Sequence, residues 1–115
     1  YKKYKEWCDK YFYLPHRKEP RGIGGIFFDY KKDNFEKNFK FVRDVGVTFG
    51  SIFQKIITKK SKKKWTSQDK ENQYIKRGRY AEFNLLYDRG TKFGLQTGGN
   101  VEGILMSLPP HAKWK

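Results

Sequence analysis

The stretch from Arg77 to Asn100 constrains the fold most, because its side-chain pattern changes twice over a short distance. Residues 80–87 alternate between two faces, which is typical of a half-buried β-strand. Residues 88–91 follow, and a second strand-like run covers residues 92–97. An aspartate in a turn hydrogen-bonds nearby backbone groups, and a glycine close to it supplies a positive φ angle. The sequence therefore predicts a β-hairpin that turns at residues 88–91.

Three other segments, residues 1–13, 34–57 and 101–108, have apolar residues at spacings of three and four, which is typical of amphipathic helices. A further helix is predicted at residues 67–76, where Ser67 with Lys70 and Glu71 indicates a helix start. We expect the apolar face of the longest, 34–57, to point into the core. Residues 21–29 are rich in glycine and predict one more strand, against which a flat group or a helix can lie. The predicted fold class is therefore α+β, an antiparallel β-sheet flanked by α-helices.

The turn of the predicted hairpin combines Asp88 with Arg89, and one face of the first strand carries Glu82 and Asn84. A surface turn with two charges is the simpler interpretation of such a pair. An acid, a guanidinium and two polar side chains together suit a cleft better than a packed sheet. Guanidinium groups also bind carboxylates through two parallel hydrogen bonds, which lysine cannot do. Asp88 and Arg89 are therefore candidate site residues.

The chain has a formal net charge of +14, from 26 Lys and Arg against 12 Asp and Glu. A basic nucleic-acid-binding module is one interpretation, because lysine and arginine neutralise phosphates. Modules that bind single strands also need organised aromatic residues, but the richest lysine run, residues 59–64, has only Trp65 beside it. A solvated loop is the simpler interpretation. We therefore expect no specific nucleic acid as a partner.

Composition sets further limits. Cys8 is the only cysteine, which excludes an internal disulfide and a cysteine-rich zinc site. No apolar run is long enough for a transmembrane helix, so we expect no membrane span. Hydrophobic residues make up 37% of the chain and aromatic residues 18%. Because the independent core is small, we expect the aromatic side chains to need further neighbours, from another part of the protein or from a second subunit.

A series of longer motifs runs through the chain in a fixed order. They are Tyr11-Phe-Tyr-Leu-Pro-His-Arg, Arg21-Gly-Ile-Gly-Gly-Ile-Phe-Phe-Asp, Arg77-Gly-Arg-Tyr, Glu82-Phe-Asn-Leu, Tyr87-Asp-Arg-Gly-Thr, Phe93-Gly-Leu, Thr97-Gly-Gly and Ile104-Leu-Met-Ser-Leu-Pro. Together they resemble the C-terminal portion of the oxygen-dependent coproporphyrinogen III oxidases. The resemblance implies that residues 1–115 are the C-terminal part of a single oxidase domain, with the N-terminal part absent. It also implies that this fragment is inactive alone.

The resemblance further implies an activity in haem and porphyrin biosynthesis, the oxidative decarboxylation of coproporphyrinogen III to protoporphyrinogen IX. Two propionates become vinyl groups, molecular oxygen is the co-substrate, and no cofactor is required. Asp88 is the expected acceptor of the pyrrole N–H groups, and Arg89 is the expected propionate clamp. Gly98, Gly99 and Asn100 match a segment that contacts substrate. His16 matches a candidate ligand for a divalent metal.

The resemblance also implies a homodimer, through a dimerisation region that starts at Tyr80 and ends at Lys115. The expected location is the cytoplasm, with the mitochondrial intermembrane space as the alternative. Two other functional interpretations stay open at this point. One is the basic nucleic-acid-binding module, and the other is a non-catalytic remnant of the oxidase that only dimerises.

Overall fold

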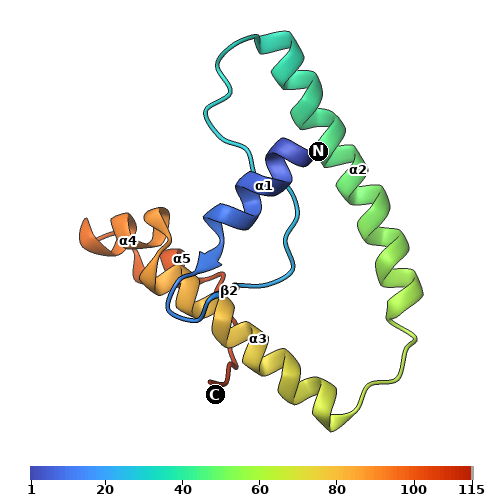
Figure 1. Ribbon diagram of the computed structural model, residues 1–115, viewed down its shortest axis with the longest axis vertical. Helices are drawn as coiled ribbons and strands as arrows, with labels where there is room; N and C mark the ends of the chain where they lie inside the picture. The colour runs from blue at the N-terminus through green and yellow to red at the C-terminus, as the bar shows by residue number, and fades with distance from the viewer. Residues whose placement is uncertain (115) are drawn as a thin grey trace. The chain divides into compact units, whose positions relative to one another are not determined.

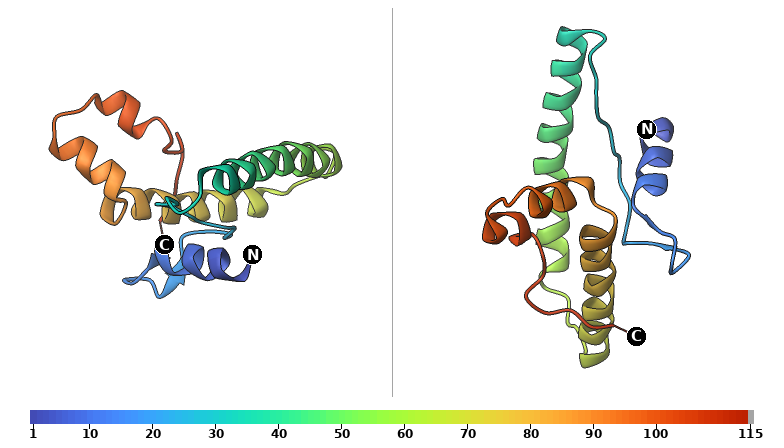
Figure 2. Two further views of the ribbon diagram at one scale, coloured as in Figure 1. Left: turned by 90° about the horizontal axis from the view of Figure 1, so that it is seen from above. Right: turned by 90° about the vertical axis from the view of Figure 1, so that its left-hand side faces the viewer.

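The structure is a computed structural model that describes residues 1–114. The chain divides into two compact units. Unit 1 joins residues 1–27 to the chain from Thr66 onward, and unit 2 is Phe28–Trp65. Figures 1 and 2 show the elements, which in chain order are α1 (Lys2–Tyr11), β1 (Tyr13–Leu14), β2 (Glu19–Pro20), α2 (Phe35–Lys60), α3 (Ser67–Leu86), α4 (Arg89–Gln96) and α5 (Val101–Leu105).

The fold class is α+β, as predicted, because helices accompany a small antiparallel sheet. In this sheet Tyr13 pairs with Pro20 and Leu14 pairs with Glu19. The sheet lies elsewhere than the sequence indicated, since its two strands flank the turn of residues 15–18. This β1–β2 hairpin places that turn against α3 (Figure 1).

The core of unit 1 forms where α1, the β1–β2 hairpin and α3 meet. Leu14 and Phe83 are almost fully buried, with exposed fractions of 0% and 2%. Around Phe83 the rings of Tyr11, Phe12 and Phe27 pack with centroid separations between 4.6 and 5.8 Å. Such aromatic pairs stabilise a core beyond the area that they bury. Part of the aromatic content of the chain therefore packs in this core.

The predicted hairpin at residues 80–97 is wrong. Residues 80–86 lie in the second half of α3, and residues 92–96 lie in α4. The apparent alternation of residues 80–87 also contains a helical repeat, because Tyr80, Phe83 and Tyr87 are three and four residues apart. Asp88 does bind the local backbone, but as the N-cap of α4: its side chain accepts a hydrogen bond from the Thr91 N–H. The same side-chain chemistry serves turns and helix starts.

The sequence does locate the start of α3. Thr66 and Asp69 form a reciprocal capping box, in which each side chain accepts from the other residue's backbone N–H. The predicted helix at residues 67–76 is therefore confirmed at its first residue, and it continues ten residues further, to Leu86. Without a strong stop signal before Tyr87, the helix continues through the segment whose alternation predicts a strand.

The strand predicted at residues 21–29 is also wrong, because this segment has no regular secondary structure. Its backbone N–H groups bond to α1 and to Phe12, the residue after α1, and not to another strand. The Arg21 N–H donates to the Phe12 carbonyl at 2.9 Å, and the Phe27 N–H donates to the Tyr4 carbonyl at 3.1 Å. The Gly25 N–H points at the buried Cys8 sulfur at 3.4 Å.

The end of the chain returns along α3 after α4 and α5 (Figure 2). The Lys113 N–H donates to the Tyr74 carbonyl at 3.1 Å, and the Lys113 ammonium pairs with Glu71 at 2.6 Å. This close approach requires Gly78, because a Cβ atom there would overlap the Lys113 carbonyl oxygen. The glycine of the Arg-Gly-Arg-Tyr motif therefore has a packing role.

We expect Gly78→Ala to destabilise unit 1 by about 1–3 kcal/mol, because the Cβ atom meets backbone that must shift as a whole. Urea-induced unfolding measures this change. Gly46→Ala in α2 is the matched control, since a Cβ there meets nothing within 4 Å and alanine favours a helix by up to about 1 kcal/mol. Equal stability of Gly78→Ala and the parent would show that the return of the chain over α3 is not tightly packed.

Unit 2 consists of the loop of residues 28–34, the long helix α2 and the short segment of residues 61–65. Asn34 caps α2 by accepting from the Lys37 N–H at 2.9 Å, so the helix predicted at residues 34–57 is confirmed and extends to Lys60. The expectation that its apolar face is buried is wrong for the described residues, because no residue of α2 is buried. Nothing in unit 2 is large enough to cover a helix of 26 residues.

Candidate active site

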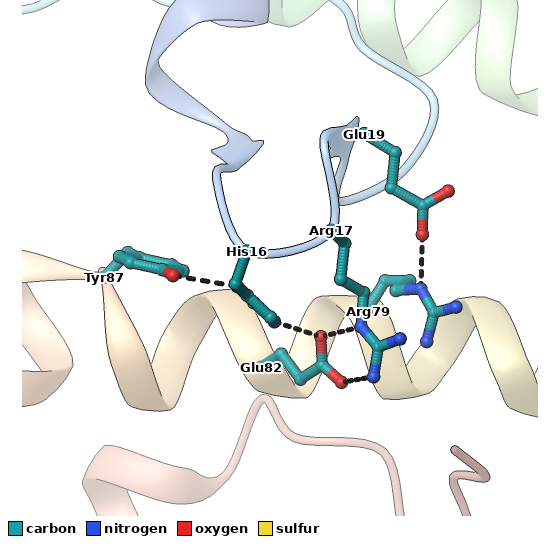
Figure 3. Close-up of polar contacts among 6 residues, drawn as sticks. All are labelled: His16, Arg17, Glu19, Arg79, Glu82 and Tyr87. Carbon is teal, nitrogen blue, oxygen red and sulfur yellow. Dashed lines mark hydrogen bonds and ion pairs between the residues drawn. The ribbon is translucent and has the colours of Figure 1, made fainter. Parts of the chain in front are cut away.

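The turn of residues 15–18 brings two side chains onto the middle of α3 (Figure 3). The Arg17 guanidinium holds the Glu82 carboxylate through two parallel hydrogen bonds of 2.6 and 2.5 Å. His16 Nε2 lies 3.0 Å from a Glu82 oxygen, and His16 Nδ1 lies 2.8 Å from the Tyr87 hydroxyl. Because a carboxylate can only accept, the ring proton lies on Nε2, and in the neutral ring the Tyr87 hydroxyl donates to Nδ1.

Glu82 is the electrostatic centre of this group. Its side chain is only 11% exposed, and the two bonds from Arg17, helped by His16, lower its pKa from 4.5 to about 2 despite the opposing effect of burial. Bidentate, charge-assisted pairs of this kind fix geometry as well as charge. The Glu82 carboxylate therefore stays ionised and holds both the turn and the imidazole ring in one orientation.

A stability measurement between pH 2 and pH 5 tests this group. The folded pKa of Glu82 is depressed, so its contribution to stability is present above about pH 4.5 and is lost as the pH falls toward about 2. We expect Glu82→Gln to be less stable at neutral pH and to lose less stability across this acid range than the parent. Thermal unfolding as a function of pH measures both. A mutant whose pH dependence matches that of the parent would contradict the assignment.

A second carboxylate, Glu19 of β2, binds the same helix one turn earlier. It accepts from Arg79 Nε and lies 3.7 Å from the Lys76 ammonium. The hydrogen bond from Arg79 is the main reason why the pKa of Glu19 is lowered. Within the described residues Arg79 Nη1 is buried without a hydrogen-bond partner. The hairpin is thus joined to α3 by two ion pairs of opposite polarity, Arg17–Glu82 and Glu19–Arg79.

Arg21 is a cation that three aromatic rings surround. Its guanidinium carbon lies 4.0 Å from the Phe12 ring centroid, 4.8 Å from that of Tyr80 and 5.3 Å from that of Phe83. Its Nε atom is buried without a hydrogen-bond partner among the described residues. Burial lowers the pKa of Arg21, and nearby groups that include Asp88 partly oppose this change. Arginine nevertheless stays charged at neutral pH.

A cavity of about 720 Å³ opens beside Arg21. Residues of β2, the three residues after it and the middle of α3 line it, namely Glu19, Pro20, Arg21, Gly22, Ile23, Gln73, Lys76, Arg77 and Tyr80. Three of these side chains are cations and one is a carboxylate. The volume lies within the usual range for small-molecule sites, about 300–1,000 Å³. The cavity therefore suits an organic molecule with anionic groups.

The predicted site residues lie near the C-terminal end of α3. Asp88 is partly exposed, and its Oδ2 accepts from the Thr91 N–H at 2.7 Å and from the Thr91 hydroxyl at 2.9 Å. Arg89 is the first residue of α4 and is exposed. Neither lines the cavity beside Arg21. Asp88 is one of several groups whose charge raises the pKa of Arg21 against the larger effect of burial.

Gly98, Gly99 and Asn100 lie in the exposed turn between α4 and α5. Gly98 has a φ angle of 70°, which glycine adopts without strain. Asn100 is the N-cap of α5: its side chain accepts from the Gly103 N–H at 3.3 Å. One N–H group at the start of α5 is therefore already satisfied by Asn100 itself, and this turn lies apart from the lining of the cavity.

Comparison with known proteins decides the family. The family model described as coproporphyrinogen III oxidase matches residues 1–115. The chain belongs to the coproporphyrinogen III oxidase family. Relatives named oxygen-dependent coproporphyrinogen-III oxidase include those of Rickettsia bellii (strain OSU 85-389) and Rickettsia rickettsii (strain Sheila Smith), each 62% identical over 115 residues, and that of Rickettsia akari (strain Hartford), 61% identical. Each alignment covers 99% of this chain and 41% of the relative.

The family resemblance seen in the sequence is thus confirmed, whereas its placement in the C-terminal portion stays a prediction, as does the single-domain assignment. The site residues, the metal, the homodimer, the location and the lack of nucleic-acid binding also stay predictions. Lys115, the last residue of the predicted dimerisation region, lies outside the described residues. No helix in the described part of the chain is long and apolar enough to cross a membrane.

The surroundings of His16 do not form a metal site by themselves. Over residues 1–114 no three His, Cys, Asp or Glu side chains gather closely enough to hold a metal ion. Both ring nitrogens of His16 already have partners, Glu82 and Tyr87. A metal at His16 would have to replace one of these hydrogen bonds, so we derive no chemical step through a metal in this family member.

The sequence does not predict which residues pair in this site. It indicates Glu82 only as part of a polar strand face, and it indicates no role for Arg21 or Tyr87. A signal is present, because the motif at residues 11–17 contains Arg17 and the motif at residues 77–91 contains Glu82, which can pair with it. The pairing itself depends on how the turn of residues 15–18 meets α3, which single-sequence patterns do not encode.

Proposed function

We propose that this chain supplies part of the active site of an oxygen-dependent coproporphyrinogen III oxidase. The match of the family model to residues 1–115 supports this proposal. Because the chain spans 41% of the length of the relatives, the activity belongs to a protein that also contains the rest of the family's length. The reaction converts two propionates of coproporphyrinogen III to vinyl groups, giving protoporphyrinogen IX. Each conversion releases CO2 and transfers one hydrogen with two electrons to O2.

The structural observation that best supports this proposal is the cationic cavity beside Arg21. Coproporphyrinogen III carries four propionates, so its pocket needs fixed positive charge next to flat apolar surface. Arg21, Lys76 and Arg77 supply charge, and Tyr80 supplies an aromatic face. The buried Nε of Arg21 has no hydrogen-bond partner among residues 1–114. A carboxylate that reached it would satisfy a costly buried donor.

The predicted site residues then receive roles as proposals. Asp88 gathers pyrrole N–H groups on one face of the macrocycle and stabilises positive charge that develops on an oxidised pyrrole. Arg89 binds a propionate, and the turn of Gly98, Gly99 and Asn100 contacts another part of the substrate. No metal or organic cofactor enters these roles.

We further propose that the protein is a homodimer, with the region from residue 80 to residue 115 at the interface. Several large apolar side chains of α4, α5 and the segment after them support this, since Phe93, Val101 and Met106 are 69%, 52% and 84% exposed. Exposed apolar side chains that cluster in one region are typical of protein interfaces. Sedimentation of a full-length protein that carries residues 1–115 of this chain with Phe93→Asp tests this proposal, which predicts monomers.

The test of the cavity uses a full-length chimera, in which residues 1–115 replace the matching residues of the Rickettsia bellii protein. We expect Arg21→Gln to raise the KM for coproporphyrinogen III about tenfold or more, because a charge-assisted bond to a carboxylate contributes about 1.5–3 kcal/mol. Steady-state kinetics under oxygen measure KM. Arg43→Gln on α2 is the matched control, since Arg43 pairs only with its exposed neighbour Asp44 in the described structure. An unchanged KM with normal folding would remove Arg21 from the substrate site.

A further inference from the structure

Aromatic rings hold the side chain of Arg21, whereas carboxylates hold the arginines near it. Arg17 and Arg79 each bind a glutamate. Within residues 1–114 Arg21 forms no ion pair, and its buried Nε has no hydrogen-bond partner. Its backbone is fixed, because its N–H donates to the Phe12 carbonyl at 2.9 Å. The guanidinium therefore starts from a fixed point of the chain and depends on ring contacts for its orientation.

The three rings around Arg21 orient it without using its donors. The guanidinium carbon lies 4.0, 4.8 and 5.3 Å from the ring centroids of Phe12, Tyr80 and Phe83. A cation over the face of a ring is attracted by the charge distribution of the ring. The N–H donors of a guanidinium point outward in its own plane, so stacking on rings leaves them for a carboxylate. Ring contacts of this kind suit an arginine that binds a ligand.

Tyr80 differs from the other two rings. Phe12 and Phe83 also pack on each other, with centroids 5.2 Å apart, and Phe83 is almost fully buried in the core. Tyr80 is only half-buried, and it alone of the three lines the cavity of about 720 Å³ beside Arg21. It precedes Phe83 by three residues on α3, so both rings lie on the same side of the helix. Tyr80 is thus the ring contact of Arg21 on the side of the cavity.

We propose that Tyr80 is a positioning residue, whose ring holds the Arg21 guanidinium at the cavity with its N–H donors available to a carboxylate of the substrate. This inference rests on the proposed function, in which the cavity beside Arg21 binds a propionate. The ring of Tyr80 acts through the guanidinium. Without this ring Arg21 is less ordered before the substrate binds, and ordering a long side chain during binding reduces affinity.

Equilibrium binding of coproporphyrin III tests the proposal without turnover. This aromatic form of the substrate keeps the four carboxylates, and its fluorescence reports binding. Tyr80→Phe keeps the ring and Tyr80→Leu removes it; each is made in the full-length chimera, alone and together with Arg21→Gln. Tyr74→Leu is the matched control, because Tyr74 is a half-buried residue of the same helix that does not line the cavity. Tyr80→Met replaces Tyr80→Leu if thermal unfolding shows that the latter does not fold.

We expect Tyr80→Leu to raise the Kd for coproporphyrin III about threefold to tenfold, the size of effect that one cation–π contact produces. Tyr80→Phe should restore the affinity of the parent, because phenylalanine offers Arg21 a similar ring face. Tyr74→Leu should also bind like the parent. Arg21→Gln should raise the Kd about tenfold or more. In the Arg21→Gln background Tyr80→Leu should add less than about twofold, because two residues that act through one contact are not additive.

Two results would overturn the positioning role and leave the proposed function intact. One is a folded Tyr80→Leu variant that binds like the parent. The other is a full further loss of affinity when Tyr80→Leu is added to Arg21→Gln, which would mean that the ring of Tyr80 contacts the ligand itself. Binding by Arg21→Gln that equals binding by the parent, or no binding by the parent, would instead contradict the proposed substrate site, and this inference with it.

Discussion

Replacing Asp88 with asparagine in the full-length chimera is expected to lower turnover of coproporphyrinogen III about a hundredfold or more, while the protein stays folded. The helix start should survive, because asparagine caps a helix about as well as aspartate and can still accept from the Thr91 N–H. The change removes charge. An ionised carboxylate accepts several N–H groups and favours an electron-poor ring, whereas an amide accepts fewer and is neutral. Steady-state turnover and thermal unfolding of the same preparation measure the two effects.

Asp88→Ala separates the two roles of this residue. Alanine removes the charge and also the N-cap of α4, so stability should fall by about 1 kcal/mol, with an activity loss similar to that of Asp88→Asn. Full turnover by Asp88→Asn would leave Asp88 with the capping role alone. In that case the simpler interpretation of the sequence, a polar residue that only shapes the chain locally, would be correct.

Arg89→Lys is expected to reduce kcat/KM by about tenfold to a hundredfold although the charge is conserved. A lysine cannot form two parallel hydrogen bonds to a carboxylate, and a charge-assisted bond is worth about 1.5–3 kcal/mol. Arg89 is exposed at the first position of α4, so the substitution should leave stability unchanged. Kinetics with coproporphyrinogen III in the chimera measure the loss.

Lys92→Arg is a suitable comparison for Arg89→Lys, because Lys92 is an exposed residue of the same helix. It exchanges the same two side chains in the opposite direction, and we expect kinetics like those of the parent. If Arg89→Lys also behaves like the parent, Arg89 does not contact the substrate, and the cations of the cavity beside Arg21 are left as the candidate propionate ligands.

The local structure that capping residues determine could be predicted from the sequence. Asn34 and Asn100 both cap the helices that follow them, and α3 begins at the predicted Ser67. The strand predicted at residues 80–87 failed because a short run can satisfy a period of two and a helical repeat at once. The capping box at Thr66 starts a helix early enough to include that run. Propagation of a helix that has already begun is favourable, which decides between the two patterns.

The contacts of the candidate site could not be predicted in the same way. Motifs and residue chemistry indicate Asp88 and Arg89, and a matched motif indicates Gly98, Gly99 and Asn100. The structure places Arg89 at the start of α4, Asp88 at its N-cap and the other three in the turn that follows it. The bidentate Arg17–Glu82 pair joins residues that are 65 positions apart in the chain. No local propensity encodes such a pair, because it forms only when the β1–β2 hairpin packs on α3. Arg21 likewise acquires its character from Phe12, Tyr80 and Phe83, which surround it only in the folded unit.

Turnover of coproporphyrinogen III by the full-length chimera tests the central claim most directly. The chimera contains residues 1–115 of this chain in place of the matching part of the Rickettsia bellii protein. We predict oxygen-dependent formation of protoporphyrinogen IX, which stops when oxygen is removed and is lost in the Asp88→Asn variant. A chimera that unfolds as cooperatively as its Rickettsia bellii parent, yet forms no protoporphyrinogen IX under oxygen while that parent does, would contradict the proposal that this chain supplies part of an oxidase active site.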